Sequence, residues 1–159
     1  SFLVDKHACA LEVDIHGQRI PVALPEVALF NPAQIVAETA VPAAHATPQS
    51  SVPLVKLAVA RSGDKGNHSN IGVMARKPEY LAWIAAALTP EAVAEWMQHV
   101  LDGQNSKVSR WHLPASHSLN FLLENALGGG GVASLRIDPQ GKAFAQQLLE
   151  FPVPVPQGL

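Results

Sequence analysis

The side chains best able to do chemistry are concentrated in one short segment, residues 61–72. Arg61 and Lys65 supply cationic hydrogen-bond donors, and glycines free the backbone so that its amide groups can approach a ligand closely. Over residues 61–77 there are four basic residues and one acidic residue. This composition predicts an anion-binding segment, with a carboxylate or a phosphate as the ligand. The candidate ligand-binding residues in it are Arg61, Ser62, Gly63, Asp64, Lys65, Gly66 and Asn70.

The same segment has a purely structural interpretation, as a polar loop between two strands. Asp64 would then pair with Arg61 or Lys65 and hold the turn. An exposed ion pair contributes only about 0–1 kcal/mol, however, and a plain hairpin needs only about two to five loop residues. We therefore favour ligand binding. A Walker A nucleotide loop is excluded, because its Gly-x-x-x-x-Gly-Lys-Ser/Thr pattern does not occur.

The glycine run Gly128–Gly131 is a second segment that could contribute to binding. Its backbone amides could wrap a phosphate, but such a run more often ends a helix and turns into a strand, which is the interpretation we favour. Asn120 precedes the run on a predicted helix. We expect its amide to face the same crevice as the segment around Arg61.

Catalytic and metal-binding patterns are sparse. The seven histidines are scattered, without the His-x-x-x-His spacing of a helical metal site, so no metal and no cofactor is expected. His68 could act as a general base beside Asp64, although a solvent-exposed turn residue is the favoured interpretation. No Gly-x-Ser-x-Gly elbow marks a serine hydrolase.

Hydrophobic periodicity predicts an α+β fold. Helices that cover one face of a four-stranded sheet make a two-layer sandwich. The second helix has the clearest boundaries, since Thr89 suits its N-cap, Pro90 its first turn and Gly103 its stop. The strands are predicted at 55–61, 70–76, 108–113 and 132–137, and the helices at 78–88, 90–103, 118–127 and 141–149.

The chain is expected to fall into four parts. Residues 1–30 contain an alternating apolar pattern that predicts a hairpin, and they could be the tail of an upstream domain. Residues 31–53 hold four prolines and are interpreted as a linker, or else as an extended arm packed on a domain. Residues 54–151 form the folded domain. In the tail, 152–159, three prolines are expected to prevent regular structure.

Composition excludes several classes of function. The 159 residues carry a net charge of −2, which is too acidic for an electrostatic nucleic-acid binder. No stretch approaches the roughly 20 apolar residues of a membrane span. The first residues lack a signal-peptide pattern, and a single cysteine allows no internal disulfide. We therefore expect a cytoplasmic protein with neither nucleic acid nor a membrane as its partner.

Five short motifs follow one another from residue 60 onward: Ala60–Gly66, Asn70–Arg76, Leu119–Phe121, the glycine run before Ser134–Asp138, and Gly141-Lys142. Together they resemble the signature of the acyclic terpene utilisation (AtuA-like) family. The similarity covers about residues 54–151 and implies the small, ferredoxin-like C-terminal domain of that family. It also implies a large preceding domain and a role in the catabolism of acyclic terpenoids such as citronellol and geraniol, whose intermediates are acyl-CoA thioesters.

Two functional hypotheses follow. In the first, which we favour, the domain is a non-catalytic accessory module that binds a small anionic ligand, such as an acyl-CoA-type intermediate, or mediates assembly. In the second, an upstream domain completes an enzyme active site in which Asp64, Lys65 or His68 have acid/base or electrostatic roles. A homo-oligomer is also expected, because the face of the sheet opposite the helices and the sheet edges need cover.

Overall fold

The computed structural model of the protein describes residues 4–24, 31, 33, 40–41, 43–44 and 47–158. The chain divides into two units, Ser1–Val36 and Ala37–Leu159, and each is described by itself. Part of the linker predicted at 31–53 lies outside the described residues.

The first unit contains the N-terminal hairpin that the alternating pattern predicts. Strands β1 (Glu12–Ile15) and β2 (Gln18–Pro21) pair antiparallel, with Val13 opposite Ile20. A short 3-10 helix, η1 (Lys6–Ala8), precedes them. The predicted hairpin is confirmed.

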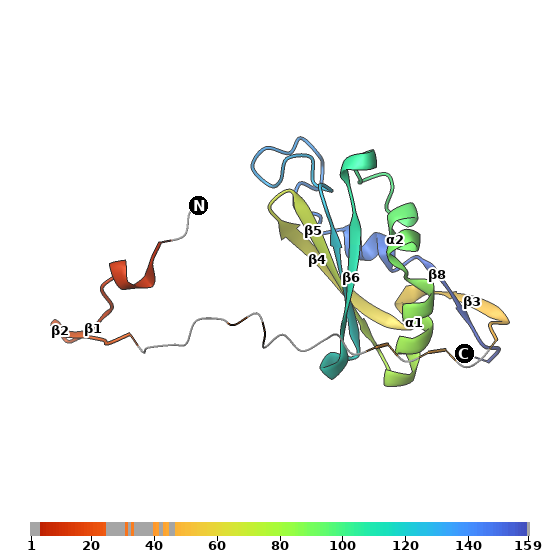
Figure 1. Ribbon diagram of the computed structural model, residues 1–159, viewed down its shortest axis with the longest axis horizontal. Helices are drawn as coiled ribbons and strands as arrows, with labels where there is room; N and C mark the ends of the chain where they lie inside the picture. Colours follow the sequence, from red (N-terminus) through yellow and green to blue (C-terminus); the bar gives the residue numbers. More distant parts are fainter. Residues whose placement is uncertain are drawn as a thin grey trace. The chain divides into compact units, whose positions relative to one another are not determined.

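The second unit is built on a four-stranded antiparallel sheet in the order β4-β5-β7-β6 (Figure 1). Its strands are β4 (Ala58–Lys65), β5 (His68–Ala75), β6 (Val108–Leu113) and β7 (Ser118–Leu123). Strand β4 begins later than predicted because residues 54–56 form a 3-10 turn, η3 (Leu54–Lys56). The strand predicted at 108–113 is confirmed at both ends.

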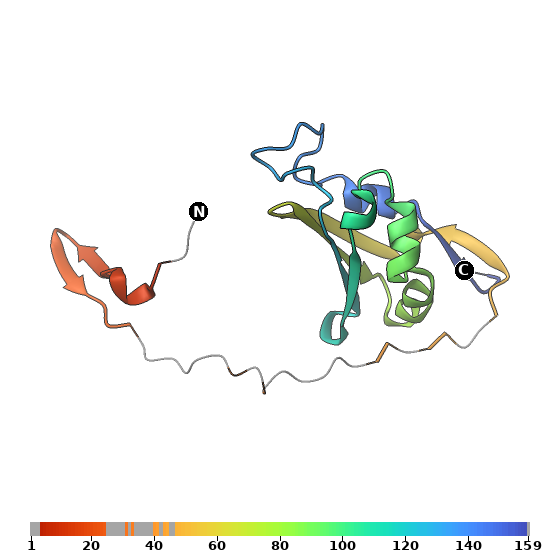
Figure 2. The same ribbon diagram turned by 45° about the horizontal axis from the view of Figure 1, so that its top comes forward.

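Helices cover one face of this sheet (Figure 2). They are α1 (Leu81–Ala87), which follows the 3-10 turn η4 (Pro78–Tyr80), then α2 (Pro90–Trp96) and α3 (Phe144–Leu148). The helices α1, α2 and α3 contact β5, β6 and β4 respectively. All three lie on the same side, because their buried side chains join one core cluster with those of the strands. The predicted α+β two-layer sandwich is confirmed. The helix predicted at 141–149 is present in a shortened form as α3.

The N-terminus of α2 follows from Thr89, as predicted. Its hydroxyl accepts a hydrogen bond from the Ala92 amide at 3.1 Å. The pKa of the Glu91 carboxyl lies below its usual value, first because its own backbone amide stabilises the charged form and second because Thr89 does. The predicted stop at Gly103 is wrong: Met97 leaves the helical conformation, so the helix ends at Trp96.

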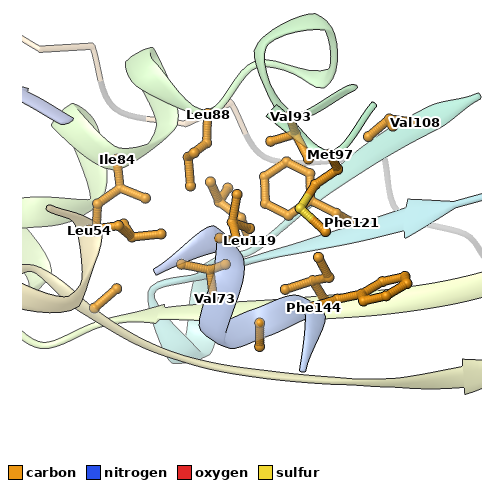
Figure 3. Close-up of a cluster of buried hydrophobic side chains, with 14 of the residues drawn as sticks. Leu54, Val73, Ile84, Leu88, Val93, Met97, Val108, Leu119, Phe121 and Phe144 are labelled. Atoms are coloured by element: carbon orange, nitrogen blue, oxygen red, sulfur yellow. The ribbon is translucent and has the colours of Figure 1, made fainter. Parts of the chain in front are cut away.

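The core lies between the helices and the sheet, as Figure 3 shows. Alternate strand residues point into it, and the large apolar ones of β5 and β7 are completely or almost completely buried. Burial of each large aliphatic side chain stabilises the fold by about 1.5–3 kcal/mol. The central side chains are Ile71, Val73, Leu119, Phe121 and Leu123 from the sheet, and Ile84, Leu88, Val93, Met97 and Phe144 from the opposite layer.

The helix predicted at 118–127 is wrong, because residues 118–123 form β7. Leu119, Phe121 and Leu123 are buried, whereas Asn120 and Leu122 between them are only half-buried, which is the two-residue period of a strand. The segment is also rich in leucine, which favours helix locally. Pairing with β5 on one side and β6 on the other decides the outcome.

The strand predicted at 132–137 is also wrong. This segment consists of turns and bends, and Val132, Leu135 and Ile137 are fully exposed. The alternation of apolar residues had favoured a strand, but the sheet consists of β4, β5, β7 and β6 and does not include this segment. The preceding glycines turn the chain away, since Gly128, Gly129 and Gly130 all have positive φ.

Regular structure continues into the proline-rich tail, contrary to expectation. Strand β8 (Pro152–Val155) pairs antiparallel with β3 (Ser50–Pro53), which comprises the last four residues of the predicted linker. Proline is tolerated here because each strand of a two-stranded ribbon has a free edge. Val153 and Val155 are completely buried, whereas Pro152 and Pro154 point outward. No helix in the described part of the chain could cross a membrane.

We expect Gly141→Ala to destabilise the second unit by about 1–3 kcal/mol. Gly141 has φ +61°, and a Cβ there would lie 2.7 Å from the Ser69 hydroxyl and 3.1 Å from Leu127. Gly103→Ala is the matched control, because Gly103 has φ +49° and open space around its missing Cβ. Urea unfolding should show a larger loss for Gly141→Ala; equal losses would contradict the close packing.

Candidate functional site

The polar segment at 61–72 is a tight β-hairpin and not the loop that the sequence predicts. Strand β4 continues to Lys65, β5 begins at His68, and only Gly66 and Asn67 lie between these paired residues. Gly66 has φ +68°, and a positive φ is required at the first of the two central positions of a type II′ turn. Apart from Gly66 in the turn and Asn120 on β7, the candidate residues therefore lie on two paired strands, whose alternation fixes the face that each one occupies.

Two glycines leave a hollow on the face of the hairpin that points away from the helices. Arg61 is opposite Gly72, and Gly63 is opposite Asn70. In each pair, one residue has a polar side chain and the other is a glycine without a side chain. On the far side of β5, Asn120 pairs with Gly72, and its amide oxygen accepts a hydrogen bond from Asn70 at 3.1 Å. The backbone of β4 and β5 is thus open to a ligand between these polar groups.

The hollow is part of an open cavity of about 390 Å³. Most of the residues that the sequence singles out line it, which brings them together in space. Gly66 and Asn120 are not among the lining residues: Gly66 makes the turn, and Asn120 is held against Asn70. The lining residues are Arg61, Ser62, Gly63, Asp64, Lys65, Asn70, Gly72 and Lys142.

Two lining residues, Gly72 and Lys142, were not among the predicted candidates, and of these Lys142 brings a charged group. Its ammonium lies 3.5 Å from the Asp64 carboxylate and 2.9 Å from the position that a Cβ of Gly63 would take. Any larger residue at 63 would therefore displace it. The only sequence signal was the motif Gly141-Lys142, which contributed to the family resemblance but carried no spacing relation to residues 61–72.

A set of hydrogen bonds positions the backbone of Lys142. The Asp138 carboxylate accepts from the Lys142 and Ala143 amides at 2.9 and 2.8 Å. The Ser62 hydroxyl donates to the Lys142 carbonyl at 3.1 Å and accepts from the Ala145 amide at 2.9 Å. Ser62 is buried, and although this residue lines the cavity, both hydrogen bonds of its hydroxyl join β4 to the start of α3.

The cavity has an excess of positive charge, with three cationic lining residues and one carboxylate. Asp64 partly neutralises Lys142, in an ion pair whose side chains are 38% and 58% exposed. Lys65 donates to the Asp64 carbonyl at 2.9 Å. The Arg61 side chain makes no hydrogen bond or ion pair with any residue that the structure describes. Its guanidinium is therefore available to an anion.

The residues of the hairpin turn hold the glycine run. The Asn67 side-chain oxygen accepts from the Gly129 amide at 2.6 Å, and its carbonyl accepts from the Leu127 amide at 3.1 Å. His68 Nδ1 accepts from the Asn125 amide at 2.9 Å. The glycine run thus packs against the hairpin turn, and one of its backbone amides, that of Gly129, is hydrogen-bonded to Asn67.

The structure does not bring Asp64 and His68 together as an acid/base pair. Asp64 is opposite Ser69, whereas His68 is opposite Lys65, so the two occupy neighbouring register positions that point to opposite faces of the hairpin. Among the residues that the structure describes, no group of three or more His, Cys, Asp or Glu side chains is arranged to hold a metal ion.

A family model for the AtuA ferredoxin-like domain matches residues 52–154. The chain belongs to this family. The match runs from β3 to β8 and contains the whole four-stranded sheet, its helices and every residue that lines the cavity. No curated protein and no solved structure was found to match the chain.

For this AtuA ferredoxin-like domain we expect Ser62→Ala to lower the free energy of unfolding by about 1–3 kcal/mol. The loss follows because the Ala145 amide and the Lys142 carbonyl would lose a buried partner. Ser116→Ala is the control for the same substitution at an exposed hydroxyl, with an expected change within about 0.5 kcal/mol. Similar values for the two variants in denaturant unfolding would show that Ser62 has no such structural role.

Proposed function

We propose that this domain binds a small anionic ligand in the cavity lined by Arg61, Lys65 and Lys142. The observation that carries the proposal is the convergence of three cations on one hollow whose floor is backbone, at Gly63 and Gly72. An exposed sheet edge needs no such arrangement for stability, because isolated surface ion pairs contribute little. A ligand carboxylate or phosphate would satisfy the Arg61 guanidinium in a bidentate manner.

Side chains, and not helix amides, supply the charge for this binding. The amides at the start of α3 are already hydrogen-bonded, to Asp138 and to Ser62. The cavity thus depends on Arg61 from β4 and on Lys142 from the segment before α3. Because these residues come from distant parts of the sequence, the site exists only in the folded domain.

The wider role that we propose is that of an accessory domain in acyclic terpenoid catabolism. The support is the family resemblance of the motifs, together with the match to the AtuA ferredoxin-like domain. The ligand would then be an acyl-CoA-type intermediate of citronellol or geraniol breakdown, and the partner a larger upstream domain or a second copy of the chain. Binding of such thioesters in preference to acetyl-CoA, measured by isothermal titration, would support this role; equal affinities would count against it.

We expect Arg61→Ala and Lys142→Ala each to weaken binding of inorganic phosphate by about tenfold to a hundredfold. A hydrogen bond to a charged group contributes about 1.5–3 kcal/mol, and each variant removes at least one. NMR titration of amide shifts would measure the dissociation constants. Raising the salt concentration should weaken binding to the wild type as well.

Lys56→Ala is the matched control, because Lys56 is exposed and lies outside the cavity. Its affinity for phosphate should equal that of the wild type. The proposal fails if the wild-type domain does not bind phosphate or acetate, or if Arg61→Ala and Lys142→Ala bind as well as Lys56→Ala does.

Asp64→Asn should strengthen anion binding, by up to about fivefold. The carboxylate competes with the ligand for Lys142, and an exposed ion pair of this kind contributes about 0–1 kcal/mol. The alternative, an active site in which Asp64 is an acid or base, makes no such prediction for binding and requires loss of turnover instead. Titration of Asp64→Asn with phosphate separates the two: weaker binding would contradict the role assigned here to Asp64.

A further inference from the structure

The face of the sheet that points away from the helices has an apolar half beside the cationic cavity. Four large apolar side chains on it are 38–47% exposed: Val59, Met74, Trp111 and Leu113. They come from β4, β5 and β6, at strand positions that alternate with the buried core residues. Exposed apolar residues gathered on one face mark a binding surface more often than residues scattered singly do.

The register shows that this apolar surface is continuous with the cavity. One row across the sheet runs Arg61, Gly72, Asn120 and Trp111, and the next row on the same face runs Val59, Met74, Ser118 and Leu113. Gly72 has no side chain, so it leaves a gap between Arg61 and the strands beyond it. Trp111 lies three strand spacings from Arg61, or about 14 Å.

We propose that the ligand is an amphipathic anion, with its charged head in the cavity and a hydrocarbon chain lying across Gly72 toward Met74 and Trp111. This inference rests on the proposed anion binding and adds the surface on which the apolar part of the ligand would lie. A hydrocarbon chain would cover the apolar half of the face, while its carboxylate or phosphate would pair with Arg61 and Lys142. One molecule would thus cover the exposed apolar side chains and neutralise the cations of the cavity.

Charge argues against a second copy of the chain as the occupant of this face. Within the four strands, no acidic residue occupies a position on the exposed face. Two such faces packed together would bury Arg61 and Lys65 without a carboxylate from the partner's face, and unpaired buried charges are strongly unfavourable. An anionic ligand supplies the charge that this face lacks.

The test is a series of straight-chain carboxylates, from acetate through butanoate and hexanoate to octanoate, titrated below the concentrations at which they self-associate. If the hydrocarbon chain of the ligand lies on the apolar half of the sheet face, each added methylene should tighten binding to the wild type about twofold to fourfold. Trp111→Ala and Met74→Ala should flatten this gain. Leu135→Ala is the matched control, since Leu135 is fully exposed on another segment, and it should keep the wild-type gain.

The possible outcomes separate this inference from the proposed function. The proposal of an amphipathic ligand is wrong if acetate binds but longer carboxylates bind no more tightly, or if Trp111→Ala keeps the full increase in affinity per methylene. In either case the proposed anion site is still supported. If none of the carboxylates binds, both fail. If light scattering shows a wild-type dimer that Trp111→Ala converts to a monomer, while octanoate leaves the dimer intact, a second copy occupies the face and the inference is overturned.

Discussion

The register between β4 and β5 is the constraint on which the site and much of the core depend. A two-residue turn at Gly66 and Asn67 sets it, and every pair back to Ala58 and Ala75 follows. Because side chains alternate between faces, a slip of one residue would move Ile71 and Val73 out of the core. It would also turn Arg61 and Asn70 toward the helices. Burial of one set of side chains therefore determines the exposure of the other.

The cavity also depends on the long-range connection between the edge strand β4 and the segment before α3. Ser62 points into the interior and joins the two by hydrogen bonds to Lys142 and Ala145. That connection brings an ammonium to the edge strand, beside a glycine that leaves room for it. A serine that the pattern placed among the ligand-binding residues thus acts on the site through the backbone of a lysine.

The two faces of the sheet differ in what they require. Helices bury one face, and the resulting core accounts for the hydrophobic residues of alternate strand positions. The other face combines cations, amides, glycines and exposed apolar side chains, a mixture that neither a core nor a simple solvated surface needs. This contrast is the physical basis for our proposal that the second face recognises an anion with an apolar part.

Local sequence patterns predicted much of the architecture. The helix start at Thr89 and Pro90 was predictable because capping depends on neighbouring residues alone. The strand at 108–113 was predicted as well, although its apolar residues do not share one face: Val108 is buried, whereas Trp111 and Leu113 are exposed. The cluster of polar residues from Arg61 to Asn70 was visible as well, since its members are close in the sequence. What these patterns lacked was any information about which segments pair.

Tertiary structure decided the rest. Residues 118–123 have both helix-forming leucines and a strand-like alternation, and only the hydrogen bonds offered by β5 and β6 favoured the strand. Residues 132–137 alternate in the same way but join neither edge of the sheet, whereas residues 152–155 pair with β3 despite their prolines. The sequence by itself therefore determined the fold class and the cationic, glycine-containing composition of residues 61–72. Only the packed chain placed Lys142 in the site, because an ion pair between residues 78 positions apart, Asp64 and Lys142, depends on chain topology and not on local preference.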